Sequence, residues 1–264
     1  MTKKELNSKN VEEGKKIEVL SSQQIEEYLR NFKDDDLPAQ MQIEKLNAIS
    51  NQISIKNNFD FDYKKVPLDD EKVYKAFSSG SSDSVLLFGT SSFKKYLQEF
   101  QPKNFNDLAI IRTITLPGLT DLFTEILKNK NSGKFKSQFT CCGDILFETY
   151  GVLLYQEQLI QIVQRLAGYS YEEADSFYRD LMRKKLPILM TRQSSFIKDS
   201  LETGFVCSED EACDVFDSFF ACLVAYPKSL AISYTLLIYW DMYFKVNYPL
   251  EYSEIAETNT DINK

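Results

Sequence analysis

Four cations stand close together in the stretch FYRDLMRKK, residues 177–185: Arg179, Arg183, Lys184 and Lys185. On a helix, Arg179 and Arg183 are four residues apart and therefore lie on one face. Guanidinium and ammonium groups bind phosphate oxygens, so this stretch could contact a nucleotide or a nucleic-acid backbone. The same cations also suit the C-terminus of a helix on dipole grounds alone. The sequence leaves both interpretations open.

A second candidate is a polar run near the start of a helix expected over residues 152–168: Tyr155, Gln156, Glu157 and Gln158. Apolar residues recur at helical spacing through this segment, and Gly168 ends it. Polar side chains inside such a pattern are expected where a helix borders a functional cleft. The alternative is a polar network that is buried for structural reasons.

The residue types that are missing restrict the chemistry further. The chain contains no histidine, which excludes Ser-His-Asp and Cys-His nucleophiles. Asp60 and Asp62 in FDFD could form a carboxylate pair for a metal, but a solvated loop is the simpler interpretation. The five cysteines are odd in number and show no CxxC spacing, which predicts reduced thiols and disfavours zinc.

Composition bounds the class of protein. The chain has 264 residues, 43% of them hydrophobic, and a net charge of -8. This acidic balance argues against a nucleic-acid coat that is basic throughout, although it permits a local basic strip. The longest apolar run, LAISYTLLIYW at 230–240, is much shorter than the ~20 residues that span a membrane. With no signal peptide evident, we expect a cytoplasmic protein that does not contact membranes.

The elements that must position these residues are mostly helices. Amphipathic periodicity and helix caps recur along the chain, and Ser170 with Glu173 forms a capping-box pattern. We therefore predict a mainly α fold with little strand, the clearest strand candidate being SVLLFGT at 84–90. The predicted organisation has three parts: a mobile N-terminal tail with a short helix (1–36), a helical domain (37–256) and a disordered C-terminal tail (257–264).

The order of these segments resembles a known family. The stretch ETYGVLLYQEQLIQIVQRLAGYSYEEADSFYRDLMRKK (148–185) is similar to the fingers region of the C-family bacterial DNA polymerase III alpha subunit. That family carries a TYG…YQEQ…A-G-Y…AD…R…KK series at this spacing. Further similar segments are VPLDDEKVYKAFSSG (66–80), FNDLAIIRTITLPG (105–118) and AYPKSLAISYTLLIYWDMYFKVNYP (225–249). The resemblance covers residues 37–256 and implies a fingers-like helical domain.

The resemblance also implies roles for the candidate residues. In the family, the cationic strip faces the incoming triphosphate, and the YQEQ segment lines the inner wall of the active site. In YPKSLA, Lys228 and Ser229 match the family pattern, whereas Pro227 and Leu230 replace its Asn and His. The implied ligands are primer–template DNA or a nucleotide.

Several departures from the family pattern bear on activity. The family's palm holds two magnesium ions with three aspartates, two of which lie upstream of the matching region. Ala39 stands in the place of the third, and a methyl group cannot ligate Mg²⁺. The family's RPGP is Leu116–Leu119 here, and Tyr178 replaces the first of two adjacent arginines. The resemblance therefore implies a truncated, degenerate relative with no catalytic residue, metal or cofactor of its own.

Three functions follow from this resemblance. The first is a catalytically inactive binding module of DNA replication or repair, which contacts DNA, a nucleotide or other polymerase subunits. The second is one half of a split DNA-directed DNA polymerase whose palm is on another chain. The third is a protein-interaction scaffold that has lost nucleic-acid binding, which the acidic charge and the lost Arg and His favour. Fold alone does not choose between them.

Overall fold

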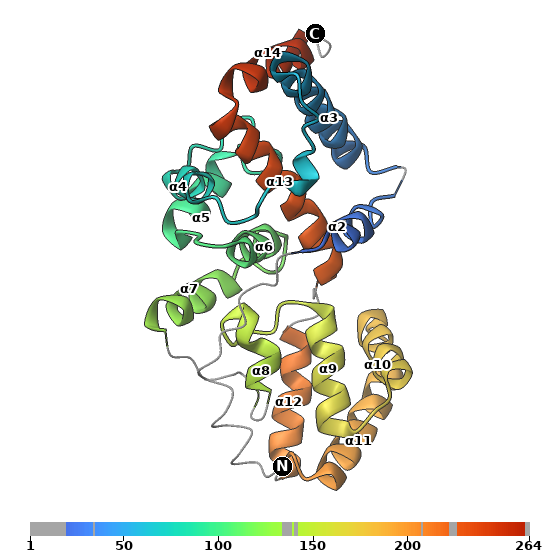
Figure 1. Cartoon of the computed structure of the whole chain (residues 1–264). Coiled ribbons are helices and arrows are strands. Elements are labelled where there is room, and N and C mark those ends of the chain that lie inside the picture. The colour runs from blue at the N-terminus through green and yellow to red at the C-terminus, as the bar shows by residue number, and fades with distance from the viewer. Residues whose placement is uncertain are drawn as a thin grey trace. The chain divides into compact units, whose positions relative to one another are not determined.

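The computed structural model describes residues 20–33, 35–133, 139, 142–206, 208–221 and 226–261. Helices account for most of these residues (Figure 1). Within these ranges the only β interaction is an isolated parallel bridge between Tyr155 and Tyr226. The prediction of a mainly α fold is therefore confirmed.

The described residues fall into two compact units. The first unit comprises residues 116–228, and the second comprises residues 20–115 together with 229–261. The predicted three-part division of the chain stays a prediction, but two of its segments can be compared with the structure. Helix α2 (Ser22–Leu29) is the short helix expected inside 1–36, whereas residues 1–19 lie outside the described residues. Helix α14 (Pro249–Asp261) continues past the tail boundary predicted at 257.

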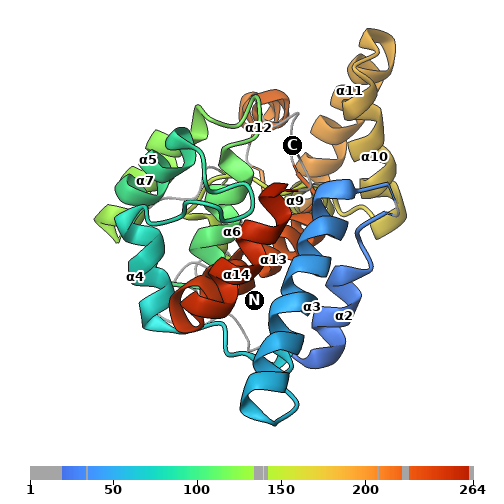
Figure 2. The ribbon, with the colours of Figure 1, turned by 90° about the horizontal axis from the view of Figure 1, so that it is seen from above.

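The second unit is built around helix α13 (Lys228–Asn247), which belongs to it from Ser229 onward. Every residue of α13 from Thr235 to Met242 is buried, so neighbours cover the helix on all of its faces. Figure 2 shows α2 and α3 on one side of α13, with α4 and α5 on the other. The elements around it are α2, α3 (Leu37–Asn57), η1 (Tyr63–Lys65), α4 (Glu71–Ser79), α5 (Ser91–Phe100), α6 (Phe105–Ile114) and α14.

A buried ion pair links α13 to its neighbours in this unit. The Lys45 ammonium lies 2.7 Å from Asp241, whose side chain is fully buried. Lys45 also donates to the Tyr252 hydroxyl at 2.9 Å, and the Leu86 N–H donates to the other Asp241 oxygen at 2.9 Å. Each Asp241 oxygen therefore has a donor from another part of the chain, as a buried charge requires.

The strand predicted over residues 84–90 is wrong. This segment forms consecutive turns, in which Ser84 and Leu87 have positive φ values of 63° and 60°. Its apolar side chains Val85 and Phe88 are buried, so the sequence pattern is that of a core segment without strand pairing. Short apolar runs are ambiguous in this way because periodicity cannot identify their backbone conformation.

The first unit contains a helical bundle. Its elements are α7 (Leu122–Ser132), α8 (Gly143–Leu146), η2 (Phe147–Thr149), α9 (Gln156–Ala167), α10 (Tyr171–Arg183), α11 (Leu186–Thr203) and α12 (Glu209–Ala221). Helix α11 packs against α9, α10 and α12. Phe177, Phe196, Phe216 and Phe219 form an aromatic core there, with ring centroids 5.4–6.3 Å apart. This core fixes the helices that carry the candidate site.

The start of α10 confirms the capping box predicted from the sequence. The Glu173 N–H donates to the Ser170 hydroxyl at 3.2 Å, and the Ser170 N–H donates to the Glu173 carboxylate at 2.8 Å. These bonds to Ser170 lower the pKa of the Glu173 carboxyl. A cap that the sequence encodes therefore fixes the start of α10, the helix that carries Arg179 and Arg183.

Candidate nucleic-acid interface

The cationic stretch forms a tight corner between two helices. Helix α10 ends at Arg183 and α11 begins at Leu186, so only Lys184 and Lys185 connect them. We call residues 183–186 the α10–α11 corner. Lys184 adopts the left-handed conformation with φ 51°, and both connecting lysines are exposed. The geometry thus presents two adjacent ammonium groups to solvent.

The two arginines of the stretch have acidic partners on their own helix. Arg179 lies 2.6 Å from Asp175, and Arg183 lies 3.3 Å from Asp180. The arginine side chains remain 67% and 62% exposed. Surface pairs of this kind contribute about 0–1 kcal/mol. Either guanidinium can therefore exchange its carboxylate for a phosphate at small cost.

Asp180 is held mainly by another residue, Arg192 of α11. The Arg192 guanidinium donates to one Asp180 oxygen from Nε at 2.8 Å and from Nη2 at 2.6 Å. It also donates to the Ser176 hydroxyl at 3.0 Å. The Asp180 side chain is only 14% exposed. Arg192 neutralises this carboxylate and links α10 to α11. The Arg183 guanidinium, at 3.3 Å, therefore interacts with Asp180 more weakly than Arg192 does.

Lys184 and Lys185 differ from the arginines. Neither has a carboxylate within ion-pair distance among the described residues. The exposed face of α10 itself carries mixed charge around a shallow depression, which is lined by Tyr171, Glu172, Asp175, Ser176, Arg179, Asp180 and Arg183. The free positive charge is therefore concentrated at the α10–α11 corner and does not extend along the helix.

The YQEQ segment is organised differently. Helix α9 begins at Gln156, four residues later than predicted, because residues 151–154 are not helical and Tyr155 is extended. The Gln158 side-chain oxygen accepts from the N–H groups of Leu154 and Tyr155, both at 3.0 Å. Its side-chain nitrogen donates to the Ile145 carbonyl at 3.2 Å and the Thr149 hydroxyl at 2.9 Å. Gln158 thus holds the segment that leads into α9.

Burial separates the four residues of this segment. Tyr155 is 1% exposed and Gln158 is 2% exposed, so both lie in the core of the first unit. Gln156 and Glu157 are only half-buried, and the Gln156 N–H donates to the Tyr226 carbonyl at 3.2 Å. Of the predicted site residues here, Gln156 and Glu157 are the two whose side chains reach solvent.

Glu157 positions Lys228, another candidate from the sequence. The Lys228 N–H donates to both Glu157 oxygens, at 3.1 and 2.9 Å, and its ammonium lies 2.6 Å from Glu148. Lys228 therefore contacts two carboxylates of the first unit, one through its backbone and one through its ammonium group.

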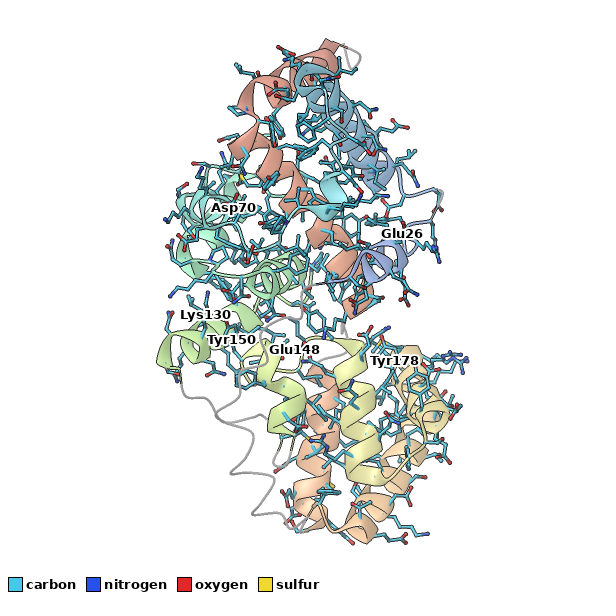
Figure 3. The ribbon with its side chains drawn as sticks, viewed as in Figure 1. Glu26, Asp70, Lys130, Glu148, Tyr150 and Tyr178 are labelled. Carbon is cyan, nitrogen blue, oxygen red and sulfur yellow. The ribbon has the colours of Figure 1, made fainter. Side chains whose placement is uncertain are left out.

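Tyr178 of α10 lies close enough to Glu157 to feel its charge. Burial, followed by the nearby charges of Glu157 and Asp175, raises the pKa of Tyr178. Figure 3 shows Glu148 beside the start of α9 and Tyr178 on α10.

Ser229 belongs to the second unit, although it follows Lys228 directly. Its carbonyl accepts a hydrogen bond from the Ser233 hydroxyl at 2.8 Å within α13. The structure thus brings the four residues 179, 183, 184 and 185 together along α10 and its C-terminal corner. It joins Lys228 to Glu157 and assigns Ser229 to the other unit.

The positions considered for a metal serve other purposes in the structure. Ala39 is fully buried, and its N–H donates to the Asp36 side chain at 3.2 Å. Asp62 caps η1 by accepting from the Lys64 N–H at 3.0 Å. In the part of the chain that the structure describes, no group of three or more Cys, Asp or Glu residues could hold a metal ion.

Two further sequence features can be located. Cys142 is buried and Cys213 half-buried, both as free thiols, whereas Cys141, Cys207 and Cys222 lie outside the described residues. Across the described ranges, none of the helices combines the length and the apolar character needed to cross a bilayer.

Sequence reasoning missed Arg192 and its partner Asp180. These residues lie on neighbouring helices, and nothing in their spacing along the chain identifies a contact between them. It also missed the exposure of Leu186 and Met190 on α11, which are 68% and 61% exposed. Helical periodicity could not show that these two large apolar residues of α11 face solvent.

Comparison with known proteins agrees with this architecture. The family model described as the bacterial DNA polymerase III alpha subunit finger domain matches residues 42–204. DNA polymerase III subunit alpha of Staphylococcus aureus (strain COL) is 28% identical over 206 residues, covering 77% of this chain and 19% of the relative. The same subunit of Staphylococcus epidermidis is 29% identical over 200 residues, covering 75% and 19%.

The chain therefore spans about a fifth of the length of these relatives. The family match includes the cationic stretch and the YQEQ segment, whereas Ala39, Lys228 and Ser229 lie outside it. The matched region takes in α4 to α11 and ends where α11 does, at the Gly204 cap. The chain belongs to the bacterial DNA polymerase III alpha subunit finger domain family.

Proposed function

We propose that the chain is a binding module of DNA replication or repair whose cationic stretch contacts the phosphates of DNA or a nucleotide. The observation that carries this proposal is the state of the cations at the α10–α11 corner. Lys184 and Lys185 are exposed without a carboxylate partner among the described residues, and Arg183 is loosely paired. Cations left available in this way bind phosphate without first losing an internal partner.

The net charge supports a localised interface. With a net charge of -8, the chain as a whole is repelled by nucleic acid. Attraction must come from a restricted site, and phosphate contacts there release counterions from the DNA. The binding we propose is therefore salt-dependent and sensitive to a few side chains.

The proposal assigns no catalytic step to the chain alone. At the position where the family resemblance places a palm aspartate, Ala39 offers no oxygen ligand for Mg²⁺ and is buried. Primer extension by the purified chain with Mg²⁺ and nucleotides would contradict this part of the proposal.

The test is fluorescence anisotropy of a labelled primer–template, titrated with the protein at low and moderate salt. We expect a Kd that is micromolar or tighter at low salt and that weakens as salt rises. A variant with Arg179, Arg183, Lys184 and Lys185 changed to Glu should lose binding at least tenfold. Its matched control reverses four other exposed cations, which are 72–78% exposed: Lys65, Lys75, Lys95 and Lys198.

The two variants change net charge equally, so they separate a local interface from a general charge effect. Retained binding in the control and loss in the corner variant support the proposal. Equal losses in both, or no salt-dependent binding by the wild type, would overturn it. The latter result would favour the protein scaffold that has lost nucleic-acid binding.

A further inference from the structure

Two large apolar side chains are exposed immediately after the lysines. Leu186 is 68% exposed and Met190 is 61% exposed. They are four residues apart on α11 and therefore lie on the same face of the helix. Leu189, between them, is 8% exposed and packs in the core. The first turns of α11 thus carry one apolar residue inward and two outward.

The outward pair adjoins the free cations. Lys184 and Lys185 directly precede Leu186, and the cationic and apolar groups are consecutive in the chain. A phosphate alone would use only the cations of this surface. A ligand that uses the whole surface must present negative charge and an apolar face within the same short segment.

Single-stranded nucleic acid has this combination of properties. Its phosphates are anionic, and its unstacked bases expose their faces to side chains. In an intact duplex the base faces are stacked on one another, so only the backbone and the groove edges are accessible. Leu and Met side chains contact base faces where proteins insert them between partly unstacked base steps, so they suit bases that are already unstacked.

We infer that the surface formed by Lys184, Lys185, Leu186 and Met190 binds single-stranded nucleic acid, with the lysines on phosphates and the apolar pair on exposed base faces. This inference rests on the proposed function and goes beyond it by naming the form of the nucleic acid. It predicts that the apolar pair contributes to single-strand affinity and contributes little to duplex affinity.

The experiment compares a labelled single-stranded oligonucleotide with the blunt duplex made from it, by anisotropy at low salt. The variant Leu186→Ser/Met190→Ser retains every charge. Its control is Ile55→Ser/Leu250→Ser, which alters two apolar residues of the second unit that are 82% and 70% exposed. Because all four side chains are exposed, both variants should melt at the temperature of the wild type, and circular dichroism checks this.

We expect the corner variant to bind the single strand about tenfold more weakly, which is the lower part of the range known for aromatic contacts to bases, because Leu186 and Met190 are aliphatic. Duplex binding and the control should change by less than about twofold. An unchanged single-strand Kd in the corner variant would overturn the inference while leaving salt-dependent duplex binding, and thus the proposed function, intact. If the wild type bound neither the single strand nor the duplex but did bind anionic lipid vesicles, both the inference and the proposed function would be overturned. The corner would then be a membrane-binding surface.

Discussion

The start of α9 and the α10–α11 corner are two polar regions of the same unit that are used in different ways. At the start of α9, Gln158 is buried and its side chain makes four hydrogen bonds to neighbouring groups. At the corner, Lys184 and Lys185 are exposed and have no acidic partner among the described residues. Both regions lie inside the family match.

This difference shows which polar residues remain available for a ligand. A side chain whose donors and acceptors are all used within the core stabilises the fold, and a ligand could engage it only by breaking those bonds. Exposed ammonium groups lose little when they exchange water for phosphate. We therefore expect changes at the start of α9 to alter stability and changes at the corner to alter binding.

The largest effect is expected for Gln158→Leu. The substitution leaves the Leu154 and Tyr155 N–H groups without their acceptor inside the core, and each buried unsatisfied group costs about 1–3 kcal/mol. We predict a loss of roughly 2–4 kcal/mol in the free energy of unfolding, measured by urea denaturation. Gln156→Leu is the matched control, because Gln156 is half-buried, and it should change stability by less than ~0.5 kcal/mol. Equal effects of the two substitutions would remove the distinction within this segment.

The next effect concerns binding. Lys184→Gln/Lys185→Gln removes two charges from the corner without altering its backbone. If both ammonium groups contact phosphates, the slope of log K against log salt should become shallower by about 1.4–1.8. Anisotropy at several salt concentrations measures this slope, and stability should stay within ~0.5 kcal/mol of the wild type. An unchanged slope would place the phosphate contacts elsewhere.

Lys184→Gly should sharpen the comparison by raising stability while weakening binding. Lys184 has φ 51°, a conformation that costs a non-glycine residue roughly 1–2 kcal/mol and glycine very little. The greater entropy of glycine in the unfolded chain offsets part of this relief. The free energy of unfolding should therefore rise by roughly 0.5 kcal/mol. Lys185 has an ordinary φ of -85°, so Lys185→Gly should lower stability instead. Loss of stability in Lys184→Gly would contradict this explanation of the corner.

The smallest expected effect is the acid dependence of one surface pair. The Arg165 guanidinium donates hydrogen bonds to Asp144 in α8 and lowers the pKa of that carboxyl. A lowered folded-state pKa stabilises the protein above the ordinary value of about 3.9, and this contribution is lost as the pH falls through the folded-state value. The pair is partly exposed, so Asp144→Asn should remove only about 0.5 kcal/mol at neutral pH.

Urea denaturation at neutral and acid pH tests this effect. Asp144→Asn should fall less steeply in stability than the wild type as the pH drops below about 4. Primer–template affinity at neutral pH should not change, because Asp144 lies outside the corner. Parallel pH profiles for the two proteins would show that the pair contributes nothing to acid stability.

Local rules predicted the parts of the fold that depend on neighbours in sequence. The capping box of Ser170 and Glu173 is confirmed, as is the glycine end of α9 at Gly168. The strand expected at 84–90 is wrong, because its backbone is set by distant groups such as Asp241. Contacts of that kind have no signature in the local pattern.

The candidate site was predictable to a similar extent. The positions of Arg179 and Arg183 on one helical face follow from their spacing. Their pairing could not be predicted, because the contact between Asp180 and Arg192 joins two helices. Burial of Gln158 also depends on tertiary packing, so the sequence could not distinguish a cleft lining from a buried network.

Lysine footprinting tests the central claim most directly, because Lys184 and Lys185 lie at the corner and Lys228 is bonded to Glu157 at the start of α9. Reagent labelling of Lys184, Lys185 and Lys228 would be measured by mass spectrometry, with and without primer–template. We predict that nucleic acid protects Lys184 and Lys185, whereas Lys228, held by Glu148, is labelled slowly and equally in both samples. Protection of Lys228 with unchanged labelling of Lys184 and Lys185 would contradict the account, because it would place the ligand at the start of α9.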